Sequence, residues 1–191
     1  MKDAARAEAR VIRARLTPAE IVECSARIAT RVETMDVFRR AKTVACYLAL
    51  PREVQTAPLL VACRRAGQRV CVPAYDDRAG CYRLAWLTVN DVLTPGRWQV
   101  PEPVEPGWVQ QPAAVEVVMV PGLLFDPTGR RIGHGGGGYD RLLEGLSAYK
   151  IALAFAAQLL ARVPVAAHDV LMDAVVTENE IYFRAQRVAR G

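Results

Sequence analysis

Short runs of apolar residues alternate along the chain with longer stretches in which apolar and charged positions are mixed. Each apolar run has the length of one strand, and runs of this kind are typical of strands buried on both faces. The runs that predict strands are residues 43–50, 69–73, 116–121, 150–156 and 174–177. Residues 81–88 alternate apolar and polar positions, which predicts a strand with one solvated face.

The first mixed stretch, residues 2–15, is rich in alanine and arginine and predicts a helix. Helical spacing places Arg6, Arg10 and Arg13 on one face of it. From the pattern alone, we expect that face to be solvated.

A second helix has a clear start signal. Thr17 can cap it, Pro18 suits the first helical position, and Glu20 can complete a capping box. We expect this helix to end near Thr34. Two further helices are predicted, at residues 56–67 and at residues 139–145.

The order of these elements predicts the fold class. Strand–helix–strand alternation favours a parallel sheet covered by helices. We therefore expect an α/β fold, a three-layer α/β/α sandwich around a mainly parallel sheet, formed by residues 1–191 as a single domain. Five prolines fall between Pro95 and Pro112, which predicts an irregular crossing segment there.

Composition excludes several classes of protein. Apolar residues make up 52% of the chain and charged residues 24%, whereas disordered chains are poor in apolar residues. No run of about 18 apolar residues is present, so no membrane-spanning helix is expected. The amino terminus lacks the apolar core of a secretory signal. We expect a cytoplasmic protein with no membrane partner.

The five cysteines do not form a recognisable metal or disulfide pattern. Their number is odd, no two are separated by two residues, and most lie in apolar stretches. We expect small buried hydrophobes in a reducing compartment rather than a zinc site or a disulfide framework.

The formal net charge is +5, and nearly all basic residues are arginines scattered along the chain. Basic charge with little aromatic interleaving is weak evidence for a nucleic-acid interface. A modest excess of positive charge equally suits a small polyanionic substrate. The charge alone leaves both interpretations open.

Residues 120–143 carry the candidate chemistry. Five of the six residues from Gly133 to Gly138 are glycine. Glycine allows backbone N–H groups to approach a ligand closely. Such groups bind anions, and Arg130 and Arg131 are suited to pairing with phosphate oxygens. Asp140 follows the loop, where its carboxylate could hold a metal ion that bridges those oxygens.

Neither common phosphate-binding device explains this loop. Gly133, Gly135 and Gly138 match the spacing G-x-G-x-x-G, but the preceding strand ends near Pro121 and position 158 is Gln158 rather than an acid. A P-loop is excluded because no Gly-Lys-Ser/Thr follows the glycines. The sequence indicates phosphate binding by another arrangement.

The stretch from Phe125 to Arg141 resembles the glycine motif F-D-x-x-G-x-R-[LI]-G-x-G-x-G-Y-Y-D-R of the 5-formyltetrahydrofolate cyclo-ligase family. Other matches follow the family order along nearly the whole chain. They are an early Lys-x-x-x-Arg at Lys2 and Arg6, the stretch from Leu48 through Glu53-Val54-Gln55-Thr56, a Pro-Glu-Pro at Pro101–Pro103, and Met172–Glu178. Each match alone is weak, but together they form a specific pattern.

The resemblance implies an enzyme that closes 5-formyltetrahydrofolate to 5,10-methenyltetrahydrofolate with ATP and Mg²⁺. It implies small-molecule substrates, no nucleic-acid partner and a monomer. In the implied mechanism, ATP phosphorylates the formyl oxygen, N10 attacks the formyl carbon, and phosphate leaves. The role of the protein is then mainly positioning and neutralisation of charge.

The resemblance also implies roles for individual residues. Arg131 and Tyr139 are the implied catalytic residues, and Leu48 and Glu53 the implied folate contacts. Asp140 and Asp173 are the implied magnesium ligands. The implied ATP contacts are Lys2, Arg6, Arg131, Gly133, His134, Gly135, Gly136, Gly137, Gly138 and Tyr139.

One position departs from the family pattern. Gly138 stands where the family has the first of two tyrosines, which removes a ring and a hydroxyl near the expected position of the formyl group. This departure keeps a second hypothesis open, a relative that binds folate or nucleotide with altered or no cyclo-ligase activity. A third hypothesis, a nucleic-acid-binding module, rests on charge alone.

Overall fold

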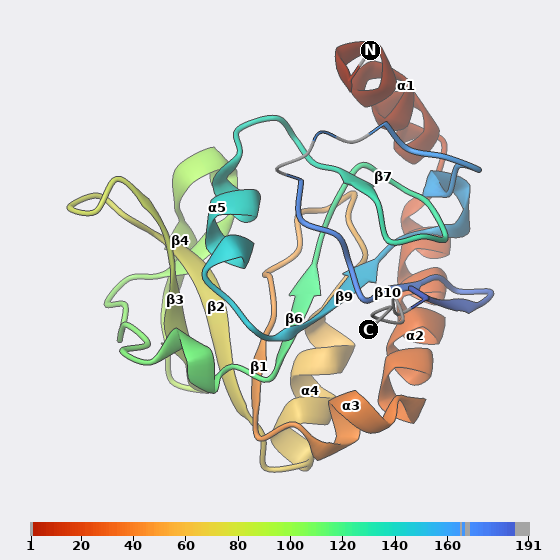
Figure 1. Ribbon diagram of the computed structural model, residues 1–191. Coiled ribbons are helices and arrows are strands. Elements are labelled where there is room, and N and C mark those ends of the chain that lie inside the picture. Colours follow the sequence, from red (N-terminus) through yellow and green to blue (C-terminus); the bar gives the residue numbers. More distant parts are fainter. Residues whose placement is uncertain (1, 165, 167–168, 186–191) are drawn as a thin grey trace, which may run out of the picture.

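A seven-stranded sheet forms the centre of the molecule in the computed structural model, which describes residues 2–164, 166 and 169–185 (Figure 1). The strand order is β11-β10-β9-β6-β1-β2-β3. The strands are β1 (Thr43–Ala45), β2 (Arg69–Asp76), β3 (Cys81–Leu87), β6 (Val117–Val120), β9 (Tyr149–Leu153), β10 (Ala174–Val176) and β11 (Ile181–Phe183).

The five central strands are parallel, and only the two edge strands, β3 and β11, are antiparallel to their neighbours. The prediction of a mainly parallel sheet is therefore confirmed. The predicted strand at 43–50 is shorter than expected, because regular pairing ends at Ala45. The chain then turns into a loop that carries Glu53.

Helices lie on both sides of the sheet. They are α1 (Lys2–Ala14), α2 (Pro18–Thr34), α3 (Asp36–Arg40), α4 (Ala57–Arg65) and α5 (Gly138–Glu144). The capping box predicted at the start of α2 is present, because the Thr17 side chain accepts from the Glu20 backbone N–H and the Glu20 carboxylate accepts from the Thr17 N–H. The short helix α3 was not anticipated.

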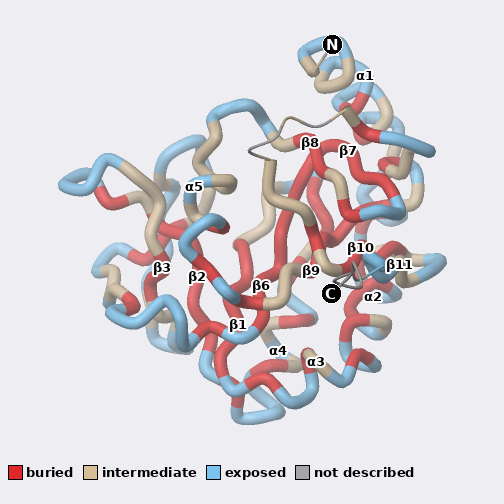
Figure 2. The backbone as a smooth tube through the Cα atoms, viewed as in Figure 1, coloured by how far each residue is buried: buried red, intermediate tan, exposed pale blue. Residues whose placement is uncertain are grey.

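Figure 2 shows that the central strands β1, β2 and β6 consist largely of buried residues. Each face of the sheet has its own hydrophobic core, because side chains alternate between the two faces of a strand. Val44, Met119 and Ile151 pack on the face covered by α2, α3 and α4. Val118 and Ala152 pack on the other face, against α5 and the loops near it. This layered arrangement confirms the α/β prediction, although the second layer holds only one short helix.

Short strands outside the main sheet complete the fold. They are β4 (Leu93–Pro95), β5 (Pro101–Pro103), β7 (Leu124–Phe125) and β8 (Arg131–Ile132). The proline-rich crossing segment is thus not wholly irregular, since β5 pairs with β4 as an antiparallel hairpin. Further along this segment, Trp108 pairs with Ala85 of β3 and anchors the crossing chain.

Three of the cysteines, Cys46, Cys63 and Cys71, are buried as expected, whereas Cys24 and Cys81 are partly exposed. All five are free thiols. Burial raises the pKa of Cys63 to about 11 and that of Cys71 to about 12, so these thiols stay protonated at neutral pH. Within the described residues, no helix has the length and apolar character needed to cross a membrane.

Candidate functional site

The candidate site lies at the carboxyl ends of the parallel strands. The loop after β1 carries Glu53, and the chain after β6 continues through β7 and β8 to the glycine-rich loop at residues 133–138. Helix α1 packs against β7 and against the turn at Ala156–Gln158 that follows β9. Loops at this edge of an α/β sheet are the usual location of ligand sites.

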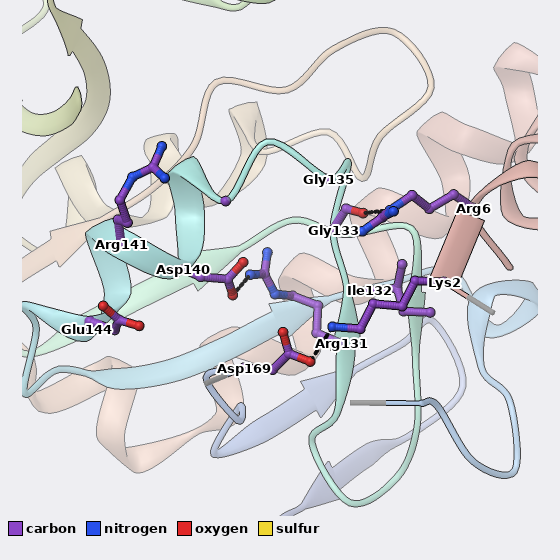
Figure 3. A pocket seen from close by; sticks show the side chains of 11 residues that line it. Lys2, Arg6, Arg131, Ile132, Gly133, Gly135, Asp140, Arg141, Glu144 and Asp169 are labelled. Atoms are coloured by element: carbon purple, nitrogen blue, oxygen red, sulfur yellow. Dashed lines mark hydrogen bonds and ion pairs between the residues drawn. The ribbon is translucent and has the colours of Figure 1, made fainter. Parts of the chain in front are cut away.

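A cavity of about 290 Å³ lies between α1, the glycine loop and α5 (Figure 3). Its lining combines basic and acidic side chains with loop glycines. The lining residues are Lys2, Arg6, Arg131, Ile132, Gly133, Gly135, Gly137, Asp140, Arg141, Glu144 and Asp169. The mixture suits a polyanion accompanied by a cation.

Lys2 and Arg6 both reach this cavity from one face of α1, as their spacing predicts (Figure 3). The Lys2 ammonium lies 2.6 Å from the Asp169 carboxylate. The Nε of Arg6 donates to the carbonyl of Gly133 at 3.2 Å, so Arg6 holds the beginning of the glycine loop. Helix α1 therefore brings two cations to the loop from a distant part of the sequence.

Arg131 is the most deeply buried cation of the cavity, with 3% of its side chain exposed. It donates through Nη2 to Asp140 at 2.5 Å and through Nη1 to the carbonyl of Pro121 at 3.2 Å. Its Nε is buried without a hydrogen-bond partner among the described residues. A buried donor of this kind is costly unless a ligand satisfies it.

The turn before Arg131 is fixed by a buried carboxylate. Asp126 is fully buried and accepts from the backbone N–H groups of Thr128, Arg130 and Val163 at 2.9–3.2 Å. These bonds hold the tight connection between β7 and β8, and so they orient the strand that carries Arg131 toward the cavity.

Two glycines of the loop have backbone conformations that side chains rarely adopt. Gly135 has φ +104° and Gly137 has φ +64°. Both line the cavity, and Gly137 immediately precedes α5. The high glycine content therefore has a specific cause at these positions, since left-handed backbone strongly favours glycine.

Not every residue of the loop faces this cavity. His134, Gly136, Gly138 and Tyr139 are absent from its described lining, although the resemblance assigns them to ATP. His134 instead approaches Glu53, with Nε2 3.5 Å from Oε1. Tyr139 is partly buried, and its burial raises its pKa well above the ordinary value, with Glu53 acting in the same direction.

Glu53 forms a second centre beside the cavity. Its Oε2 accepts from the backbone N–H of Leu50 at 3.0 Å, which leaves Oε1 facing His134. Leu48 lies partly exposed in the same loop, five residues before Glu53. The structure therefore places both implied folate contacts on the segment that follows β1.

The expectation that Arg13 is solvated is wrong, whereas Arg10 is exposed as expected. Only 9% of Arg13 is exposed, and its Nη1 lies 4.0 Å from Oε1 of Glu53. Its Nε and Nη1 are buried without hydrogen-bond partners in the described part of the chain. Burial lowers the pKa of Arg13, and the Glu53 carboxylate only partly offsets this effect.

The structure does not bring together Asp140 and Asp173, the two implied magnesium ligands. Asp173 immediately precedes β10, so it lies at the amino edge of the parallel sheet. There it accepts from the Lys150 N–H and pairs with Arg184, in a separate hollow. Asp140 lies at the opposite edge, and the second aspartate of its cavity is Asp169.

Sequence reasoning missed Asp169, Arg141 and Glu144 as lining residues. Arg141 and Glu144 follow Asp140 within one turn of α5, so helical spacing could have suggested them. Asp169 lies in an irregular segment near the end of the chain, and no local pattern marks it.

Comparisons with known proteins identify the family of the chain. The profile of the 5-formyltetrahydrofolate cyclo-ligase family matches residues 1–178. The chain belongs to this family. The cyclo-ligase of Escherichia coli K12 is 33% identical over 172 residues, which cover 87% of this chain and 94% of that protein. The mouse cyclo-ligase is 27% identical over 177 residues, 86% of this chain and 87% of that protein.

A solved structure has the same fold over the full length of the chain. The solution structure of Aquifex aeolicus 5,10-methenyltetrahydrofolate synthetase superposes with a TM-score of 0.85 at 26% identity. The match covers 100% of this chain and 99% of that one. The fold shared with that protein therefore includes the sheet, α1 and the glycine loop.

Proposed function

We propose that this protein is an ATP-dependent 5-formyltetrahydrofolate cyclo-ligase that produces 5,10-methenyltetrahydrofolate. Family membership supports the activity. The observation that carries the site assignment is the convergence of Lys2, Arg6 and Arg131 on a cavity beside the left-handed glycines. This cavity is proposed to hold the phosphates of ATP, and the adjoining Glu53 centre the pteridine of the folate.

The chemistry explains why the reaction needs ATP. A formamide carbonyl is a poor electrophile, and its oxygen is a poor leaving group. When the formyl oxygen attacks the γ-phosphorus, ADP leaves and an iminium phosphate forms. N10 then attacks the formyl carbon, and inorganic phosphate leaves with the former formyl oxygen. Positioning and neutralisation of phosphate charge supply most of the acceleration of such transfers.

Arg131 is the best-placed group for stabilising the transferred phosphoryl group. Its guanidinium is held on two sides, by Asp140 and by the Pro121 carbonyl, and its buried Nε remains available to a ligand oxygen. Lys2 and Arg6 are proposed to neutralise the outer phosphates. A planar, fixed guanidinium suits phosphate oxygens because it can donate two bonds at once.

The carboxylates of the cavity fit a magnesium ion that arrives with ATP. Among the residues described, no group of three or more histidine, cysteine or acidic side chains could hold a metal alone. Mg²⁺ needs only one or two carboxylates when phosphates and water complete its shell. Asp140 and Asp169 supply these carboxylates in this proposal. Bound Mg²⁺ would neutralise charge that develops on the phosphates.

Glu53 is proposed to bind the pteridine by accepting hydrogen bonds through Oε1. The Leu50 N–H donates to Oε2 and the Arg13 guanidinium lies near Oε1, so the carboxylate is fixed in position before substrate binds. Tyr139 links the two centres, since Arg131 lies 5.9 Å from the centroid of its ring. We expect the formyl group to lie near this ring, between the pteridine and the γ-phosphate.

The test is ATP-dependent formation of the methenyl product, followed by its near-UV absorbance with 5-formyltetrahydrofolate and Mg²⁺. A reaction without ATP controls for acid-driven ring closure. We expect a rise with the wild-type protein that is lost in Asp140→Ala, while Asp36→Ala, an exposed aspartate, retains it. Folded wild-type protein that binds ATP but gives no rise would contradict the proposal.

A further inference from the structure

Gly138 is covered by an aromatic ring from another part of the chain. A Cβ added at Gly138 would lie 3.0 Å from Cδ2 and 3.4 Å from Cε2 of Tyr82. Gly138 begins α5 with no left-handed φ, so its backbone would accept a side chain. The obstacle is therefore the Tyr82 ring, and this ring and a side chain at position 138 compete for the same space.

Tyr82 is held in this place by neighbours on the edge of the sheet. Its ring packs edge-on against Tyr75 of β2, with centroids 5.4 Å apart and planes at 79°. The guanidinium of Arg97 lies 4.2 Å above the Tyr75 ring, and the Tyr75 N–H donates to Glu102 at 3.1 Å. The ring is thus positioned by a fixed aromatic pair while remaining partly exposed.

Tyr82 lies beside Gly138 and outside the lining of the phosphate cavity. Gly137 faces the phosphate cavity, whereas Gly138 turns toward Tyr82. The next residue, Tyr139, has a pKa raised first by burial and then by Glu53, with Tyr82 also contributing, so both groups act on Tyr139. Helix α5 packs against β3, which keeps Tyr82 beside the loop.

We propose that Tyr82 is a folate-binding residue of this protein, and that its ring forms the aromatic wall that a side chain at position 138 would otherwise form. The inference rests on the proposed function, because it takes a folate as the ligand. An aromatic face is suited to stacking on the flat rings of a folate. The wall is thus supplied from β3 rather than from the glycine loop.

The experiment is a double-mutant cycle of Tyr82→Ala and Gly138→Tyr in the full chain. Tyr82→Ala is expected to raise KM for 5-formyltetrahydrofolate about tenfold and to leave KM for ATP unchanged, as loss of one stacked ring predicts. Tyr82→Phe keeps the ring and should stay within about twofold of wild type. Tyr182→Ala, on the opposite edge strand β11, is the matched control.

The decisive comparison is made in the Gly138→Tyr background. There the new ring displaces Tyr82 and occupies its place, so Tyr82→Ala should change the folate KM by less than about threefold. An equal effect of Tyr82→Ala in both backgrounds would overturn the shared-space argument. An unchanged folate KM in Tyr82→Ala would overturn the binding role.

Equilibrium binding of 5-formyltetrahydrofolate, followed by quenching of tryptophan fluorescence, separates this inference from the proposed reaction. If the wild type binds folate without forming product, the reaction proposal fails. The Tyr82→Ala and Gly138→Tyr cycle can then still be measured through the Kd for folate. If product forms normally and Tyr82→Ala changes neither Kd nor KM, the Tyr82 inference alone fails.

Discussion

Arg13 of α1 faces Glu53 of the loop after β1, with Nη1 4.0 Å from Oε1. Both side chains are about nine-tenths buried, with 11% of the Arg13 side chain and 10% of the Glu53 side chain exposed. Arg52, adjacent to Glu53, donates to the carbonyls of Ala14 at 3.2 Å and of Arg13 at 3.5 Å, so the loop is tied to the end of the helix. Helix α1 thus places Lys2 and Arg6 at the phosphate cavity and Arg13 beside the Glu53 carboxylate.

Replacing Arg13 should weaken both stability and folate binding. Burial lowers the pKa of Arg13, so its charge is held in the folded state at a cost that Glu53 only partly offsets. We expect Arg13→Met to lower the free energy of unfolding by about 1–3 kcal/mol, because the buried Glu53 carboxylate loses its counter-charge. The KM for folate should also rise about tenfold, because Glu53 loses the guanidinium that orients it.

The exposed Arg10 on the same helix provides the control, and Arg10→Met should change neither property. Thermal unfolding and steady-state kinetics check both variants. A large loss of stability in Arg13→Met with an unchanged folate KM would show that Arg13 has a structural role only.

The aspartates should differ in their effect on magnesium. Asp140→Asn and Asp169→Asn are each expected to raise the Mg²⁺ concentration needed for half-maximal activity at least tenfold, because a carboxylate ligand is lost. Asp173→Asn should leave this concentration unchanged, since Asp173 lies at the other edge of the sheet. Magnesium titrations of product formation at saturating ATP make the comparison. A raised Mg²⁺ requirement in Asp173→Asn alone would instead identify Asp173 as a magnesium ligand.

Neighbouring glycines of the loop should respond differently to alanine. Gly137 has φ +64°, so Gly137→Ala forces a left-handed alanine and should cost about 1–2 kcal/mol of stability and lower kcat. Gly136 has ordinary φ, and a Cβ there meets nothing within 4 Å. We therefore expect Gly136→Ala to fold and react normally. Urea unfolding and kcat measurements test the pair, and equal losses in both variants would be inconsistent with this account.

Asp126 should make the fold sensitive to acid. Burial alone would raise its pKa, but hydrogen bonds from Thr128, Val163 and Arg130 bring it below the ordinary value. The unfolded chain then binds a proton more readily, so this contribution to stability is present above about pH 4 and is lost as pH falls through the lowered pKa.

Asp126→Asn is therefore expected to lower stability at pH 7 by about 1–3 kcal/mol and to flatten the dependence on pH below about 4. Unfolding curves between pH 7 and pH 2.5 measure both effects. Asp36→Asn, an exposed aspartate, serves as the control. An unchanged acid slope in Asp126→Asn would assign the sensitivity to other groups.

Local signals along the sequence predicted most helices and strands and the two α1 cations of the phosphate cavity. The capping box at Thr17 and Glu20 depends on neighbours in sequence, and so does the common face of Lys2 and Arg6. Both are found in the structure. The order of strands and helices was likewise sufficient for the parallel sheet.

The remaining features depend on contacts between distant segments. Arg13 shares the helical face of Arg6, but its burial is decided by Glu53, forty residues later. Asp169 reaches Lys2 from an irregular segment that has no periodic pattern. Asp173 could have been placed correctly, because a residue immediately before a parallel strand lies at the amino edge of the sheet.

The most direct test of the account follows the formyl oxygen. 5-Formyltetrahydrofolate labelled with ¹⁸O in the formyl group is converted with ATP and Mg²⁺ in unlabelled water, and the inorganic phosphate is analysed by mass spectrometry. If ATP phosphorylates that oxygen at the Arg131 cavity, each phosphate released carries one ¹⁸O. Unlabelled phosphate, with the label in water, would contradict the phosphorylated intermediate and the role assigned to this site.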